Sequence, residues 1–141
     1  MVYGERSTIH KLGDWGQYAL PAAAFAISVR KGDPVGIVQL GRASLITMAT
    51  IYALKFSTNT RRPDRGQYSF PSGHTGITFA SAAYLDRRYG LRYGIPAYVA
   101  ASFVGYSRIY ARKHHFIDVA AAAGIAIAVN YFFTTRFNGC A

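Results

Sequence analysis

Residues 116–133 read FIDVAAAAGIAIAVNYFF, a stretch with one charged side chain, Asp118. It is longer than an ordinary strand, and it lacks the alternation of apolar and polar residues that marks a half-buried strand. The small residues from Ala120 to Ala123 are typical of helices that pack closely in lipid. We therefore predict a helix, and we expect Asp118 to have a partner, because a carboxylate among apolar side chains is otherwise costly.

Four earlier segments have a similar character, rich in Ala, Leu, Ile and Gly. They span about residues 15–29, 35–54, 72–85 and 93–109. The pattern predicts an all-α helical bundle, integral to a membrane, with five or six transmembrane helices. A soluble bundle is the alternative, because most uncharged runs are shorter than the roughly 20 residues that a full span needs. We expect residues 1–141 to form a single domain.

The composition and charge limit the classes of molecule that this chain is expected to bind. Of 141 residues, 51% are hydrophobic and 16% are charged, so extensive burial is expected and disorder is not. The formal net charge of +10 indicates an anionic membrane surface or an anionic substrate. The cations lie in small groups without the continuous basic stripe of a nucleic-acid binder, so no nucleic-acid partner is expected. The lone Cys140 cannot form an intrachain disulfide and is interpreted as a bystander.

Three short polar clusters interrupt the apolar segments. They are Lys55 with Arg62-Pro63, then Pro71-Ser72-Gly73-His74, then Ser107-Arg108 followed by His114 and Asp118. If the third and fourth segments form an up-down hairpin, His74 and Arg108 return to the same end of the bundle. The second segment ends at Lys55 and the fifth begins near His114, so all three clusters are expected to meet there.

Such a meeting suits phosphate chemistry. Transfer of a phosphoryl group is catalysed mainly by positioning and by positive groups around its oxygens, a task that fits Lys55, Arg62 and Arg108. Ser72 and Gly73 open the third helix, whose free N–H groups form an anion site.

His114 and Asp118 are four residues apart, which on a helix places them on one face. A carboxylate bonded to one ring nitrogen would leave the other free to attack phosphorus. His74 could then protonate the departing oxygen. His115 would point about 100° away and is not the preferred nucleophile.

These clusters resemble the signature of the type 2 phosphatidic acid phosphatase (PAP2) superfamily, which includes lipid phosphate phosphatases, class A acid phosphatases and vanadium haloperoxidases. The signature is Lys, six residues, Arg-Pro; then Pro-Ser-Gly-His; then Ser-Arg, five residues, His, three residues, Asp. Every position is matched at the right spacing, and the motif-bearing core covers about residues 50–133.

The resemblance implies metal-independent hydrolysis of a lipid phosphate or pyrophosphate, without a cofactor, through a phosphohistidine on His114. It implies His74 as general acid and Asp118 as the residue that orients the nucleophile. The implied phosphate-binding residues are Lys55, Arg62, Ser72, Gly73 and Arg108.

The membrane branch of the family has six helices and a site that faces away from the cytoplasm, which implies a bacterial inner-membrane protein open to the periplasm. Only five segments are visible, so the family's first helix is expected to be absent or degraded into the polar residues before Gly13. The basic residues near the expected inner ends slightly outnumber those near the outer ends, which weakly favours this orientation.

Two alternatives remain open at this point. One is a soluble acid phosphatase or haloperoxidase with the same site, and the other is a non-catalytic binder of anionic lipid. Arg42 interrupts the second segment, and it is expected to pair with Asp118 or another acid, or to face a groove where a headgroup enters. Several lipid phosphates fit the same chemistry, and the sequence favours no particular oligomeric state.

Overall fold

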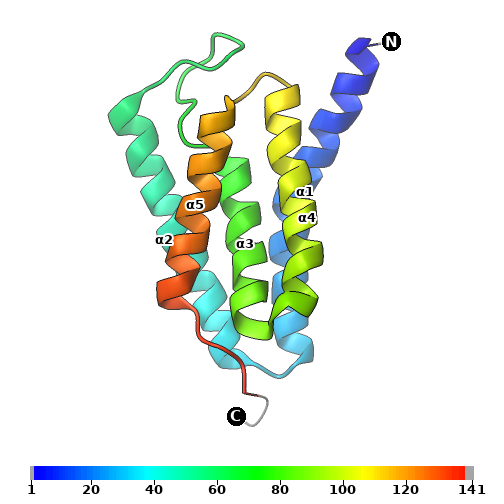
Figure 1. The fold of residues 1–141 in the computed structure, drawn as a ribbon, viewed down its shortest axis with the longest axis vertical. Helices are drawn as coiled ribbons and strands as arrows, with labels where there is room; N and C mark the ends of the chain where they lie inside the picture. Colours follow the sequence, from blue (N-terminus) through cyan, green and yellow to red (C-terminus); the bar gives the residue numbers. More distant parts are fainter. Residues whose placement is uncertain (1, 139–141) are drawn as a thin grey trace.

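The computed structural model describes residues 2–138, with side chains described from Thr8 onward, and Cys140 lies outside this range. All regular elements within it are helices, as predicted (Figure 1). They are α1 (Val2–Arg30), α2 (Pro34–Thr58), α3 (Gly73–Tyr89), α4 (Leu91–Tyr110) and α5 (Phe116–Phe133).

Local sequence signals fix several helix ends. Asp33 caps α2 by accepting a hydrogen bond from the Gly36 N–H at 2.9 Å, and Pro34 follows at a position where its missing N–H costs nothing. Ser72 caps α3 through a bond from the Thr75 N–H at 3.3 Å. Gly90 has φ +94°, a conformation that glycine adopts without strain, and it ends α3 and begins α4.

The helices are longer than the apolar segments that predicted them. α1 begins at Val2 instead of near residue 15, so Pro21 lies inside the helix and not near its start. α3 continues to Tyr89, so the predicted connector of residues 86–92 reduces to Gly90. The prediction was wrong there because Arg88 is buried against Asp33 and does not face solvent as a connector residue would.

α3 is the central helix, and it contacts all four of the others. Small side chains make this close packing possible, since each of the five helices carries alanine that is almost completely buried. These alanines are Ala24, Ala43, Ala80, Ala82, Ala83, Ala97, Ala101, Ala122 and Ala126. The bundle therefore holds α3 rigidly at its centre, and the first turn of α3 carries His74.

A buried polar network closes the end of the bundle where α1 meets α2. The Arg88 guanidinium donates two hydrogen bonds to the Asp33 carboxylate, at 2.7 and 2.6 Å, and a third to the Thr135 carbonyl at 3.0 Å. Tyr89 also donates to Asp33 at 2.8 Å. The network ties the α1–α2 connector and the segment after α5 to the C-terminal end of α3.

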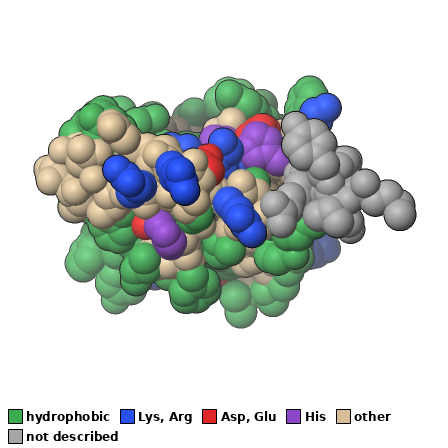
Figure 2. Space-filling model, turned by 90° about the horizontal axis from the view of Figure 1, so that it is seen from above, with side chains coloured by type: hydrophobic (Ala, Val, Ile, Leu, Met, Phe, Trp, Pro, Cys, Tyr) green, Lys and Arg blue, Asp and Glu red, His purple; other side chains and the backbone are tan. Residues whose placement is uncertain are grey.

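The outer faces of the bundle are apolar. Leu45, Val99, Phe116 and Phe132 are each more than 65% exposed. Among residues 2–138, two helices are long and apolar enough to cross a membrane, Pro34–Thr58 and Phe116–Phe133. Figure 2, which views one end of the bundle, shows charged and imidazole groups in the middle and hydrophobic side chains around the sides.

Candidate active site

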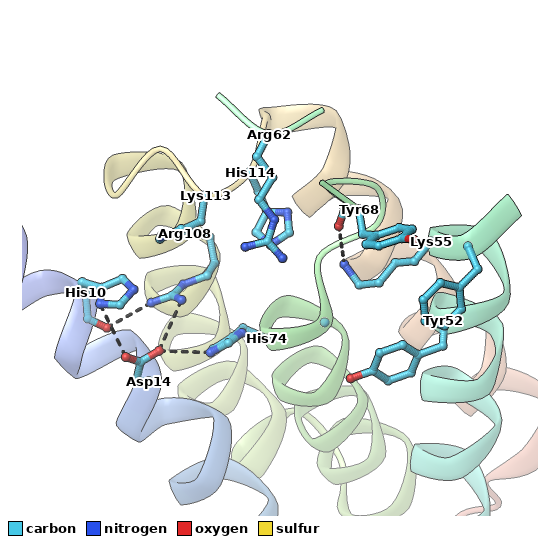
Figure 3. Close-up of a pocket in the computed structure, with 12 residues that line it drawn as sticks. His10, Asp14, Tyr52, Lys55, Arg62, Tyr68, His74, Arg108, Lys113 and His114 are labelled. Carbon is cyan, nitrogen blue, oxygen red and sulfur yellow. Dashed lines mark hydrogen bonds and ion pairs between the residues drawn. The ribbon is translucent and has the colours of Figure 1, made fainter. Parts of the chain in front are cut away.

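The three polar clusters meet at one end of the bundle, as helix parity predicted. The connector of residues 59–72 and the short connector between α4 and α5 both lie at this end (Figure 1). They border a cavity of about 520 Å³. Six predicted site residues line it: Lys55, Arg62, Gly73, His74, Arg108 and His114 (Figure 3).

Backbone carbonyls hold the three predicted cations in place. Lys55 Nζ donates to the Tyr68 carbonyl at 3.0 Å, and Arg62 Nε donates to the Gln67 carbonyl at 3.0 Å. Arg108 Nη2 donates to the carbonyl of His10 at 3.0 Å. A carbonyl orients a cation without neutralising it, so the positive charges of Lys55 and Arg62 remain available to an anion in the cavity, whereas Arg108 also contacts the Asp14 carboxylate at 3.3 Å.

Tyr68 adopts a conformation that is uncommon for a bulky residue, with φ +60°. Such a backbone costs about 1–3 kcal/mol and persists only where the surrounding structure enforces it. Its carbonyl accepts the Lys55 bond, and its ring packs edge-on against Phe56 at 5.1 Å between centroids. The strained residue thus helps to aim Lys55.

His114 is buried and hydrogen-bonded at one nitrogen. Its Nδ1 lies 2.6 Å from the Ser69 carbonyl, which can only accept, so Nδ1 carries the proton and donates. The Nε2 lone pair is therefore free. Burial, together with the positive charge of Lys55, lowers the pKa of His114 to about 4. The imidazole is therefore neutral at pH 7.

The predicted geometry of the His114 and Asp118 pair was wrong in one respect. α5 begins at Phe116 and His115 is its N-cap, so His114 precedes the helix and shares no helical face with Asp118. The Asp118 carboxylate is still only 3.8 Å from His114 Nδ1, and it accepts bonds from the His115 N–H at 2.7 Å and from the Ser69 hydroxyl. It therefore fixes the two residues that flank and hold His114.

Two predicted residues lie behind the cavity wall. Asp118 is 2% exposed, and Ser72 is fully buried with its hydroxyl oxygen engaged as the cap of α3. The Ser72 N–H donates to the Asp118 carbonyl at 3.1 Å, which joins the first turns of α3 and α5. Both residues support the site from behind, and Gly73 presents the start of α3 to the cavity.

Sequence reasoning missed part of the lining. The additional residues are His10, Asp14, Tyr52, Phe56, Tyr68 and Lys113. His10 and Asp14 are four residues apart on α1, and this spacing in a helical segment would have placed them on one face. The first apolar segment begins near residue 15, so the sequence pattern did not predict a helix over these two residues.

Arg42 does not take the predicted partner. It is exposed on α2, several turns from the cavity end. The partners of the Asp118 carboxylate in the described range are Ser69, His114 and His115. The predicted pair with Asp118 was wrong, because the two residues lie toward opposite ends of the bundle.

Comparison with known proteins now identifies the family. The model of the PAP2 superfamily matches residues 55–140. The chain belongs to the PAP2 superfamily. This PAP2 protein is a phosphoric monoester hydrolase of the lipid phosphatase branch, and its apolar helices place it with the membrane phosphatases that act on lipid phosphates.

Individual relatives agree with this assignment. The Lipid A 4'-phosphatase of Helicobacter pylori strain J99 is 28% identical over 142 residues, which align 92% of this chain with 71% of that protein. The Lipid A 1-phosphatase of Porphyromonas gingivalis is 40% identical over 101 residues, which align 69% of this chain with 21% of that protein.

Two solved structures share the fold. The crystal structure of Aquifex aeolicus LpxE superposes with a TM-score of 0.72 and 25% identity, covering 89% of this chain and 81% of that one. A transmembrane PAP2-type phosphatidylglycerolphosphate phosphatase from Bacillus subtilis superposes with a TM-score of 0.63 and 20% identity, covering 91% of this chain and 74% of that one.

Proposed function

We propose that this PAP2 protein hydrolyses a phosphate of a lipid A-type glycolipid, through a phosphohistidine formed on His114. The observation that carries the proposal is the protonation pattern of His114. A neutral imidazole, with Nδ1–H given to the Ser69 carbonyl, lines a cavity that also holds Lys55, Arg62 and Arg108. A nucleophile and the cations that would bind its target thus lie together.

In this reaction the phosphate group binds among the cations and the N-terminus of α3. The Nε2 lone pair of His114 forms a bond to phosphorus while the bond from phosphorus to the ester oxygen breaks. The electron pair stays with that oxygen, which takes a proton from His74. A water molecule then attacks phosphorus and gives a proton to His74, while the bond from phosphorus to His114 Nε2 breaks and its electron pair returns to the imidazole, so that phosphate is released. The cations stabilise the charge on the equatorial oxygens in both steps.

Two features support a glycolipid as substrate. Two proteins of similar sequence are named as lipid A phosphatases, one for the 4' position and one for the 1 position. In addition, one wall of the cavity is aromatic, formed by Tyr52, Phe56 and Tyr68. Aromatic side chains offer large amphipathic surfaces, which suit the apolar faces of a sugar ring.

The proposal extends to location and domain organisation. We propose that the protein lies in a bacterial inner membrane with the cavity open to the periplasm, which matches the expectation from the family. Residues 1–141 would act as one domain, because His10 and Asp14 of α1 line the same cavity as the motif residues. Labelling of Thr60→Cys in a Cys140→Ser background with a membrane-impermeant maleimide, in intact and in lysed spheroplasts, tests the orientation.

The function is tested by phosphate release from a panel of lipids. The purified protein in detergent would be given lipid A, phosphatidic acid, phosphatidylglycerophosphate and undecaprenyl pyrophosphate. We expect lipid A to have the highest kcat/KM. A higher kcat/KM for phosphatidic acid would reject a glycolipid as the substrate but would not contradict the phosphatase reaction.

The mechanism is tested separately. We expect His114→Ala to abolish turnover of every lipid in the panel, orthovanadate to inhibit and EDTA to have no effect. Unchanged turnover in His114→Ala would reject the phosphohistidine, and release of phosphate by no lipid at all would favour a non-catalytic lipid binder.

A further inference from the structure

A carboxylate from α1 lies inside the cavity, in contact with two of its cationic groups. Asp14 Oδ1 is 3.0 Å from His74 Nε2 and 3.3 Å from Arg108 Nη1 (Figure 3). Its other oxygen is 3.5 Å from His10 Nδ1. Asp14 precedes the residues that match the PAP2 family model, which begin at Lys55. The motif therefore assigns it no role.

The charge balance explains why this contact matters. Arg108 is 2% exposed, and a buried guanidinium beside an imidazole disfavours the protonated form of that imidazole. A general acid must be protonated before the reaction begins. The Asp14 carboxylate supplies the opposite charge, and it accepts a hydrogen bond from the Nε2–H of His74 at 3.0 Å.

The same carboxylate stands where an anion would bind. A phosphate group that pairs with Arg108 and approaches His74 must replace the contacts that Asp14 makes with these two residues. The Asp14 side chain is 39% exposed, so it has room to move aside. Its contact with Arg108 also keeps that side chain, which is anchored to the His10 carbonyl, in its binding position.

We propose that Asp14 is a positioning residue of the phosphatase reaction, which favours the protonated form of His74 and holds Arg108 in place before substrate binds, and which gives up both contacts when the phosphate group enters. The inference rests on the proposed function, because it takes His74 to be the proton donor. The proton on His74 Nε2 passes to the ester oxygen as the ester bond breaks, and Asp14 undergoes no covalent change.

The pH dependence of kcat/KM provides the test, because it reports the protonation of the free enzyme, in which Asp14 contacts His74. Other charged or titratable groups also face this cavity from the surrounding elements and contribute to the profile. They are His10, Lys55, Arg62, Arg108, Lys113 and His114. The comparison therefore changes Asp14 alone and leaves these groups in place.

The experiment measures kcat/KM from pH 4 to 10 with a short-chain phosphatidic acid for the wild type, Asp14→Asn, Asp14→Glu and Lys11→Gln. We expect the alkaline limb of Asp14→Asn to move to lower pH by about one unit, since an adjacent charge typically shifts a pKa by one unit or more. Asp14→Glu should restore most of the shift. Lys11→Gln changes an exposed residue one turn away on α1, and it should leave the alkaline limb where it lies in the wild type.

Inhibition by orthovanadate gives a second readout. Removing the negative charge of Asp14 should tighten vanadate binding severalfold in Asp14→Asn, while turnover of the short-chain phosphatidic acid falls. A purely structural role would weaken vanadate binding and leave the alkaline limb in place, and that result would overturn the proposal. Loss of all turnover in His114→Ala, with unchanged Asp14→Asn profiles, would reject the role of Asp14 and retain the phosphohistidine.

Discussion

His114 donates its Nδ1 proton to the carbonyl of Ser69 at 2.6 Å, and this bond fixes the tautomer of the proposed nucleophile. The carboxylate of Asp118 lies farther from the same nitrogen, at 3.8 Å. In this protein a backbone oxygen therefore takes the place that a carboxylate holds in many nucleophile and base pairs. Asp118 acts one step away, through the hydroxyl of Ser69 and the N–H of His115.

The first prediction concerns this indirect support. Asp118→Asn should lower kcat by about 10²-fold, because a neutral amide oxygen accepts the two bonds made to Oδ2 more weakly than a carboxylate does, and a displacement of about 1 Å is enough for such a loss. Ser69→Ala should lower kcat less, since it keeps the carbonyl that holds His114 and removes only the hydroxyl. The double variant should resemble Asp118→Asn, because both changes break the same contact.

Steady-state turnover of a lipid phosphate by the four proteins measures this coupling. Fully multiplicative losses in the double variant would show that Ser69 and Asp118 act independently. Asn130→Ala offers a control that is buried in the same helix but bonds to the Ala80 carbonyl away from the cavity. It should reduce stability without changing the coupling between Ser69 and Asp118.

The second prediction concerns acid pH. Burial lowers the pKa of His114 from 6.5 to about 4, so the neutral nucleophile persists until the pH falls near 4. The acid limb of kcat/KM should therefore lie near pH 4 and not near 6.5. For stability the sign is the same, because a lowered pKa gives a contribution that is present above 6.5 and is lost as the pH falls through 4.

A pH profile with p-nitrophenyl phosphate, corrected for ionisation of the substrate, checks this value. Lys55→Gln removes a positive charge that also lowers the pKa of His114, so its acid limb should move toward neutral pH even though its turnover is lower. An acid limb that stays in place in Lys55→Gln would contradict the electrostatic explanation.

The sequence predicted that Lys55, His74 and Arg108 lie at one end of the bundle, because each lies in the first or last turn of a helix. Lys55 is in the last turn of α2, His74 in the first turn of α3 and Arg108 in the last turn of α4, so an up-down order brings them together whatever the angles between the helices. Asp14 could not be placed in the same way. Its contact with His74 depends on how α1 packs across α3 and α4, and that packing is not encoded in a local pattern.

Backbone groups are the other part that sequence could not supply. The Ser69 carbonyl that holds His114 and the Tyr68 carbonyl that holds Lys55 belong to a connector with irregular dihedral angles. Every residue carries a carbonyl, so nothing in the sequence marks these two as ligands. The predicted connector at Arg88 was wrong for a different reason. A charged residue after an apolar run is usually exposed, whereas Arg88 pairs with the buried Asp33.

The third prediction concerns that ion pair. Arg88→Met should destabilise the protein by about 3–5 kcal/mol, because it leaves the Asp33 carboxylate buried without its partner. Asp33→Asn combined with Arg88→Met should recover much of the loss. The Arg88 bond holds the pKa of Asp33 at about 2, so the contribution is present above 3.8 and is lost as the pH falls toward 2.

Thermal unfolding in detergent measures these changes, with Arg92→Ala as an exposed control near the start of α4. The pair lies at the opposite end of the bundle from the cavity. Turnover per folded molecule should therefore be unchanged in Asp33→Asn with Arg88→Met at temperatures below its transition. A loss of turnover in the folded double variant would mean that the two ends of the bundle are coupled.

The last prediction concerns the contact between α1 and α4. Gly13 is buried, and a Cβ at this position would meet the side chain of Ser107 and lie 2.9 Å from Arg108 Nη2. Gly13→Ala should therefore cost about 1–3 kcal/mol, as overpacking does, and weaken vanadate inhibition by displacing Arg108. Gly124→Ala is the matched control, because a Cβ there meets nothing within 4 Å. Equal melting temperatures and equal vanadate inhibition in the two variants would show that α1 does not pack against Arg108 this closely.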